Sequence, residues 1–283
     1  MADLPEFLAK RHRDDVCTPT LLGVCAGYEG GAWRCDQFAQ HLILDCLLDF
    51  ILAHGEKEAL TSTTAGRQLY EAAKIVYQTN KYKRRGEFGE LLLHIVMRQF
   101  YGTLPAVSKL YVKTGVNDTV KGFDAVHVAV DGNDLELWLG EVKFYGDARQ
   151  AIRDVTSELG DHFKAEYLRN EFILIGNNLD PSWPHADVLK RLIAPQASLD
   201  GIFAKVHVPV MVTYESPTIA KHNESESDAF KAELLAELKQ HWTTFSGATL
   251  PDQVLIHFIL VPLGSKASLQ KALDDRLKAL QGL

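Results

Sequence analysis

Hydrophobic residues recur every three or four positions in several stretches of the chain, which is the spacing of one buried face of an α-helix. The segments with this spacing are residues 36–54, 64–79, 86–101, 147–169, 227–245 and 265–281. Gly86 opens the third of them and Gly102 follows it as a stop signal. The apolar stripes of the last two segments are typical of helices that pack on a core.

Runs rich in β-branched and aromatic residues lie between these helices and predict strands. The runs cover residues 107–114, 123–130, 135–145, 171–176, 203–214 and 254–262. Asp131, Gly132 and Asn133 lie between the second and third runs and are typical of a hairpin turn. We therefore expect these two strands to be antiparallel neighbours.

The order of the elements predicts an α/β fold, with a mixed sheet flanked by helices and a mostly helical region ahead of the strands. We divide the chain into a helical N-terminal region, residues 1–80, and a main domain, residues 81–283. Because no stretch rich in Pro, Gly or Ser separates them, we expect the two parts to pack as one compact unit.

The composition agrees with a soluble protein that has a substantial core, since 46% of the residues are hydrophobic and 24% are charged. The sequence has no run of about 18 uncharged apolar residues, as a membrane span would need. It also shows no signal-peptide pattern at its N-terminus. We expect a cytoplasmic protein with no membrane partner, and its four cysteines, which form no CxxC pair, to be free thiols.

The formal net charge of −7 limits how the chain could bind nucleic acid. Proteins that bind nucleic acid unaided usually carry a basic excess, because contacts to phosphate supply much of the affinity. If this chain acts on nucleic acid, either the contact is local or a partner delivers the substrate.

Two charged residues stand in an otherwise apolar stretch of the third predicted strand. Glu141 and Lys143 are two positions apart in the segment LWLGEVKFY, so both point to one face of the strand. Charged side chains in such a setting are usually paired or bound to metal. A structural ion pair is the alternative, but a buried pair is costly unless it has a task.

Asp124 precedes the apolar run AVHVAV and is the same kind of exception. The expected hairpin would place Asp124 and Glu141 near each other on one face, whereas His127 alternates to the other face and fits a packed histidine. Two carboxylates suit Mg²⁺, which prefers oxygen ligands, and the carbonyl of Val142 could supply another oxygen. Such a site could hydrolyse a phosphodiester, with Lys143 orienting water or stabilising negative charge.

The helix over residues 86–101 can complete the site with one of two carboxylates. Glu87 and Glu90 are three residues apart and share a helix face, so either could reach the metal. A basic run ahead of this helix is a candidate phosphate contact, and it consists of Lys81, Lys83, Arg84 and Arg85. Tyr145 and Gln150, which follow the E-x-K strand, are further candidates for contact with the site.

A helix glutamate, a strand aspartate and E-x-K in the following strand resemble the pattern of the PD-(D/E)xK nuclease superfamily. Phe123 stands where the proline of the motif would be. The resemblance implies a restriction-endonuclease-like core and a nuclease that depends on Mg²⁺ or Mn²⁺. The metal ligands that it implies are Asp124, Glu141, Glu90 and the carbonyl of Val142. Lys143 would position or activate the attacking water.

The segments RGEFGELLLH, KGFDAVHV, LWLGEVKFY and PVMVTYES resemble HamA, the nuclease subunit of the Hachiman anti-phage defence system. The likeness covers roughly residues 75–265. It implies a partner helicase, HamB, that restrains the nuclease, and broad degradation of DNA once the complex is activated. A helicase that brings the DNA would also agree with the acidic net charge.

Two other functions fit the same sequence. The chain could be a non-enzymatic adaptor that uses a nuclease-like fold to bind a helicase, since fold alone does not fix function. It could also be a restriction or repair endonuclease with its own sequence specificity. The residues leave open whether the substrate is DNA or RNA, single- or double-stranded, and whether the metal is Mg²⁺ or Mn²⁺.

Overall fold

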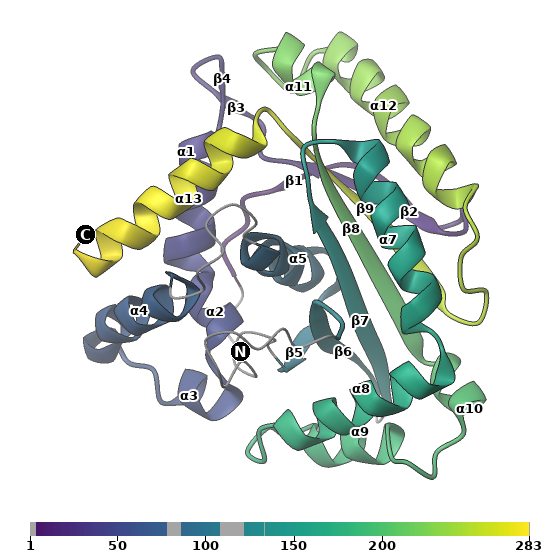
Figure 1. Cartoon of the computed structure of the whole chain (residues 1–283). Helices are drawn as coiled ribbons and strands as arrows, with labels where there is room; N and C mark the ends of the chain where they lie inside the picture. The colour runs from purple at the N-terminus through teal and green to yellow at the C-terminus, as the bar shows by residue number, and fades with distance from the viewer. Residues whose placement is uncertain (1–3, 78–85, 108–121, 133, 283) are drawn as a thin grey trace.

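A mixed β-sheet runs through the centre of the molecule in the computed structural model, which describes residues 4–77, 86–107, 122–132 and 134–282 (Figure 1). The strands of this part of the chain, in their order across the sheet, are β1 (Ala9–Asp14), β2 (Thr20–Cys25), β9 (Leu255–Leu263), β8 (Val206–Glu215), β7 (Asp134–Phe144), β6 (Ala125–Asp131) and β5 (Leu104–Val107). Strands β2, β9, β8 and β7 are parallel, and β1, β6 and β5 are antiparallel to their neighbours. A separate short pair consists of β3 (Tyr28–Glu29) and β4 (Ala32–Trp33).

One face of the sheet is covered by helices that follow β7 in the chain (Figure 1). They are α7 (Ala148–His162), α8 (Ala165–Asn178), α9 (Ala186–Leu192), α10 (Leu199–Phe203), α11 (Pro217–Lys221) and α12 (Asp228–Ser246). Helix α7 buries Ala151, Val155 and Leu159, which recur every four residues as one helix face requires. These side chains share a hydrophobic core with Leu137 and Leu139 of β7.

The other face is covered mainly by helices from the two ends of the chain and by α5 (Figure 1). The elements on this side are α1 (Cys35–Gln40), a π-helical segment (His41–Asp45), α2 (Leu47–Ile51), α3 (His54–Glu58), α4 (Ser62–Tyr77), α5 (Gly86–Tyr101) and α13 (Lys266–Gln281). Helix α5 lies between the sheet and the outer helices, so that eleven consecutive residues, 87–97, are buried. Its bounds are those predicted from the sequence.

The predicted strand over residues 171–176 is wrong, because these residues form part of helix α8. Phe172 and Ile175 are buried, while Ile173 and Leu174 are exposed at 52% and 39%. The segment EFILIG therefore has one buried face of helical spacing and two apolar residues in solvent, a pattern that a short apolar run does not reveal. The single helix predicted over residues 147–169 is likewise two helices, α7 and α8.

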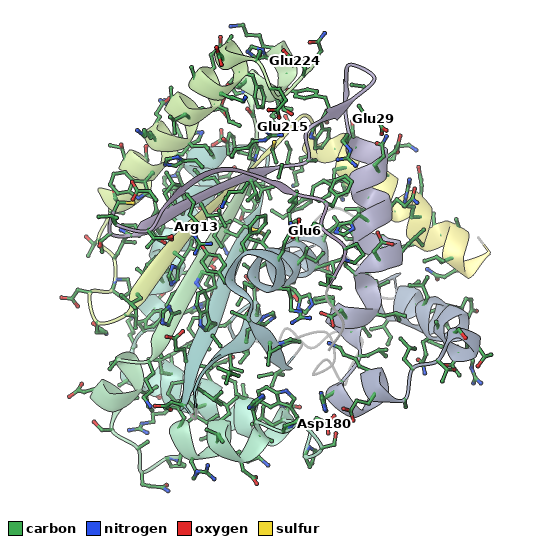
Figure 2. The ribbon with its side chains drawn as sticks, turned by 180° about the vertical axis from the view of Figure 1, so that it is seen from behind. Glu6, Arg13, Glu29, Asp180, Glu215 and Glu224 are labelled. Atoms are coloured by element: carbon green, nitrogen blue, oxygen red, sulfur yellow. The ribbon has the colours of Figure 1, made fainter. Side chains whose placement is uncertain are left out.

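The prediction that helices occupy the start of the chain missed β1 and β2. Strand β2 pairs in parallel with β9, so the central sheet includes residues from both sides of position 80. Strand β1 forms one edge of the sheet and is rich in charged residues, among them Arg13, which is labelled in the reverse view (Figure 2). Its polar sequence hides the strand from a search for apolar alternation, although charge is common on sheet edges.

The single helix predicted over residues 36–54 is divided into α1, the π-helical segment and α2. The remaining predicted strands and helices match the structure to within a few residues. An exception is the strand over residues 107–114, which lies almost wholly outside the described residues; the described strand here is β5. The four cysteines are free thiols, as predicted. Among the described helices, none is both long and apolar enough to cross a lipid bilayer.

Candidate active site

The hairpin of β6 and β7 brings Asp124 next to the strand that carries the E-x-K motif. Ala125 pairs with Gly140, so Asp124, one residue before β6, lies across from Glu141. The backbone N–H of Asp124 donates to the carbonyl of Gly140 at 2.8 Å. In return, Oδ2 of Asp124 accepts from the backbone N–H of Val142 at 3.0 Å. The predicted antiparallel pairing of these two segments is therefore confirmed.

Glu141 and Lys143 both project towards helix α7, as expected for strand residues two positions apart. Oε1 of Glu141 accepts a hydrogen bond from Nδ1 of His162 at 2.6 Å. Nζ of Lys143 donates to the carboxylate of Glu158. Glu141 is fully buried, whereas Lys143 is half-buried.

The contacts of Glu141 and Lys143 with α7 are possible because two residues along a strand span nearly the same length as four residues along a helix. Residues two apart in a strand are about 6.6 Å apart. Residues four apart in a helix share a face and are separated along the axis by about 6 Å. Glu158 and His162 therefore stand over Lys143 and Glu141 in register. Helix α7 thus holds both charged residues of the E-x-K motif.

These contacts set the charge of the two basic groups. Burial by itself would lower the pKa of Lys143, but its hydrogen bond to Glu158 and the charges of Glu158, Asp124 and Glu141 raise it above the ordinary value. Burial would also lower the pKa of His162, but the hydrogen bond to Glu141 and nearby carboxylates raise it. Lys143 is accordingly a cation at neutral pH, suited to electrostatic stabilisation rather than to removing a proton.

Helix α5 approaches the site from the opposite face of the sheet. A Cβ atom on Gly89 would lie 2.9 Å from Cβ of Phe144 and 3.2 Å from Cγ2 of Val142, so glycine permits this close packing. Glu90, the next residue, lines the same pocket as Asp124. Glu87 and Glu141 are buried, and neither is among the described residues that line this pocket; Glu141 lies directly behind it, between the lining residue Val142 and the hydrogen bond to His162.

The pocket has a volume of about 650 Å³ and lies where β7 ends. Its described lining residues are Gly86, Glu90, Asp124, Val142, Lys143, Phe144, Tyr145, Gly146, Asp147, Gln150, Asp154, Lys266 and Gln270. Tyr145 and Gln150 were proposed from the sequence, whereas Lys266 and Gln270 were not. The position agrees with the rule that ligands bind at the carboxyl ends of parallel strands.

The C-terminal helix adds a second lysine to this pocket. The backbone N–H of Lys266 donates to Oε1 of Glu215 at 2.8 Å, which ties the start of α13 to the end of β8. Glu215 is labelled in Figure 2. Nζ of Lys266 lies 5.6 Å from the ring centroid of Phe144. Lys143 and Lys266 thus face a pocket that also contains the carboxylates of Glu90 and Asp124.

The donor set fits a divalent metal bound through few protein ligands. Within the described residues, no group of three or more His, Cys, Asp or Glu side chains is arranged to hold a metal ion. Mg²⁺ commonly uses only one or two carboxylates and keeps several water ligands. Asp124 and Glu141 lie on adjacent backbone segments, and Glu90 lines the pocket with Asp124, so two carboxylates of the kind that Mg²⁺ uses face this pocket.

Two further residues of the site were not predicted from the sequence, and one predicted group lies outside the described residues. Glu158 and His162 were not proposed from the sequence, although their four-residue spacing on a predicted helix could have marked them as a pair facing the sheet. The predicted basic run, Lys81, Lys83, Arg84 and Arg85, lies outside the described residues.

His94 and His127 belong to a separate buried network rather than to the pocket. Nδ1 of His94 lies 3.1 Å from Nε2 of His127, and Nε2 of His94 lies 2.8 Å from Oδ2 of Asp49. Nδ1 of His127 lies 2.8 Å from Oγ1 of Thr103. Both imidazoles are fully buried, so the expectation that His127 is a packed strand histidine is confirmed.

The fold and the site define an α/β protein with a carboxylate- and lysine-lined pocket at one end of a mixed sheet. The model of the HamA family matches residues 3–277. The chain therefore belongs to the HamA family, and so to the components of the Hachiman anti-phage defence system. A search of the curated proteins finds no match to the sequence.

Proposed function

We propose that this chain is a metal-dependent DNA nuclease of the PD-(D/E)xK type, the effector of a Hachiman complex held in check by a partner helicase. The observation that carries the proposal is the placement of Asp124 across from Glu141, with Lys143 two residues further along the same strand. Family membership supports the defence role. The net charge of −7 supports a partner that brings the DNA.

In this proposal the carboxylates bind a metal and the lysine acts on the reacting groups. The residues that would hold Mg²⁺ or Mn²⁺ are Asp124, Glu141, Glu90 and Val142, the last through its carbonyl oxygen. A bound divalent ion would supply positive charge to the scissile phosphate and lower the pKa of coordinated water. Lys143 would hold the attacking water or a phosphate oxygen and stabilise the negative charge that develops there.

Cleavage assays on charge-removing variants test the nuclease. We expect Glu141→Gln and Lys143→Met to lower the cleavage of plasmid and linear DNA at least about a hundredfold, as the loss of one electrostatic group in an active site commonly does. Glu224→Gln is the matched control, because it removes an equal charge from an exposed residue outside the pocket (Figure 2). The assay compares Mg²⁺, Mn²⁺ and EDTA, with and without the partner helicase, and includes an RNA strand of the same sequence.

The outcomes separate the candidate functions. Metal-dependent cleavage of DNA that both site variants lose would support the proposal, and a change on adding the helicase would support the complex. Full activity in both variants would show that the site is wrongly assigned. An absence of cleavage under every condition would favour the non-enzymatic adaptor.

A further inference from the structure

His162 hydrogen-bonds directly to a proposed metal ligand, yet it lies outside the E-x-K motif. Its Nδ1 is 2.6 Å from Oε1 of Glu141, a distance typical of a strong hydrogen bond to a carboxylate. A carboxylate can only accept, so the ring donates its Nδ1 proton. Glu141 is fully buried, and the orientation of such a group depends on its hydrogen-bond partners.

The imidazole itself packs against two aromatic rings. Its ring stacks on Tyr167 with centroids 4.4 Å apart and an interplanar angle of 15°. The ring of Phe123 meets it edge-on at 5.3 Å. His162 is the last residue of α7, and its side chain is 15% exposed. Packing therefore fixes the direction in which Nδ1 points.

The contact links two parts of the site through one aromatic cluster. Phe123 is the residue before Asp124, so the ring that packs on His162 also lies next to the second proposed metal ligand. A change in the position of the imidazole would reach Glu141 through the hydrogen bond and Asp124 through the backbone. The ring is thus placed to keep the two carboxylates in a fixed relation.

We propose that His162 is a positioning residue that orients the carboxylate of Glu141 for divalent metal through its Nδ1–H. The inference rests on the proposed function, since it assumes that Glu141 binds metal. Replacing a group that hydrogen-bonds to a metal ligand commonly lowers the metal affinity by about ten- to a hundredfold. His162 would act in this way without touching the substrate.

Three substitutions separate the hydrogen bond from the packing. In His162→Asn, the side-chain amide nitrogen can occupy the place of Nδ1 and still donate to Glu141. In His162→Gln, the amide nitrogen falls near the place of Nε2 instead. His162→Phe keeps an aromatic ring beside Tyr167 and removes the donor. Asp161→Asn is the matched control, because Asp161 is an exposed neighbour on the same helix.

The experiment measures how Mg²⁺ or Mn²⁺ alone raises the thermal unfolding midpoint of the full chain, which gives an apparent Kd without any cleavage. We expect His162→Phe and His162→Gln to raise this Kd about ten- to a hundredfold. His162→Asn and Asp161→Asn should bind metal about as tightly as the wild type. Circular dichroism without metal verifies that each variant is folded, and the comparison of Asn with Gln carries the test if the Phe variant is not.

Failure of this inference differs from failure of the proposed function. If Glu141→Gln loses metal binding but the Phe and Gln variants at position 162 bind normally, His162 has no positioning role and the nuclease proposal stands. The same conclusion follows if His162→Asn is as weak as His162→Phe. If Glu141→Gln binds metal as the wild type does, the proposed metal site is wrong and the role of His162 falls with it.

Discussion

Asp124 is hydrogen-bonded to the backbone of β7, the strand that carries Glu141 and Lys143. Its Oδ2 accepts from Val142 N–H, and its own N–H donates to the carbonyl of Gly140. The carboxylate therefore closes the end of the hairpin as well as lining the pocket. These two roles have different chemical requirements. The hairpin requires a hydrogen-bond acceptor, whereas a metal ion favours a negatively charged ligand.

Substitutions at Asp124 should separate the two roles. Asp124→Asn keeps an oxygen that can accept from Val142 N–H, so we expect little change in the free energy of unfolding but a loss of metal-dependent stabilisation and of cleavage. Asp124→Ala should also lose metal-dependent stabilisation and cleavage. In addition, its free energy of unfolding should be lower by about 1 kcal/mol, because the backbone N–H of Val142 loses its acceptor. Urea unfolding of both variants, in EDTA and in Mg²⁺, measures the two effects. Equal metal binding by the Asn variant and the wild type would contradict a ligand role for Asp124.

Helix α5 and strand β7 approach closely because each has a glycine that faces a side chain of the other. A Cβ atom on Gly140 would lie 2.8 Å from Leu93, just as one on Gly89 would lie 2.9 Å from Phe144. Such contacts are shorter than carbon atoms allow, so each glycine fixes the distance between the helix and the sheet. Glu90 is carried on this helix, and its place in the pocket depends on that distance.

A methyl group at position 89 should therefore disturb the site from the opposite face of the sheet. We expect Gly89→Ala to destabilise the protein by about 1–3 kcal/mol through overpacking, and to lower cleavage by displacing Glu90. Gly160→Ala in α7 is the control, because a Cβ there meets no atom within 4 Å and alanine favours the helix by up to about 1 kcal/mol. Thermal unfolding and cleavage of both variants test this. A Gly89→Ala protein as stable and active as the wild type would show that α5 can shift without consequence.

The sequence predicted those elements whose signals are local. Asp131 and Gly132 at the turn led to the correct β6–β7 pairing, and the helical spacing bounded by Gly86 and Gly102 led to α5. Residues 171–176 in the second half of α8 were taken for a strand because this apolar run is short and two of its apolar residues face solvent. Such a run has no period of its own, so only the surrounding packing decides its structure.

The parts of the site that were missed are brought in from other elements by the fold. His162 is 21 residues from Glu141 in the chain, and Lys266 is further still, so no motif spacing relates them to the E-x-K strand. Glu141, Lys143 and Asp124 could be found because charges among apolar strand residues are unusual wherever the strand lies. Their partners on α7 and α13 are polar residues on amphipathic helices, where polar residues are common.

We expect the stability of the molecule to depend on pH, because buried and half-buried histidines lie in several parts of the fold. Burial lowers the pKa of six of them, which are His41, His94, His127, His207, His241 and His257. For His257 the value falls to about 4. These groups lie on both sides of the sheet and on several helices and strands, so their effect belongs to the whole fold rather than to the pocket. His162, with its raised pKa, acts in the opposite sense.

The pair His94 and His127 should contribute strongly, because both rings are fully buried in one network. Burial lowers the pKa of His94 although Asp49 opposes it, and burial together with His94 lowers that of His127 well below its usual value. Lys57 and Arg98, which both bind Asp49, further disfavour a positive charge on the rings. The folded state therefore holds these rings neutral at a pH where the unfolded chain binds protons.

We accordingly expect the free energy of unfolding to be highest above about pH 6.5, the unfolded pKa of histidine, and to fall as the pH is lowered towards 5. Each ring held neutral adds up to about 1.4 kcal/mol per pH unit to this slope. His127→Gln removes one titrating ring and keeps a side-chain amide that can bond within the network, so its slope should be smaller. Urea unfolding in EDTA between pH 7.5 and 5 measures both slopes. Equal slopes in the two proteins would mean that His127 has the same pKa folded and unfolded, and would contradict the neutral network.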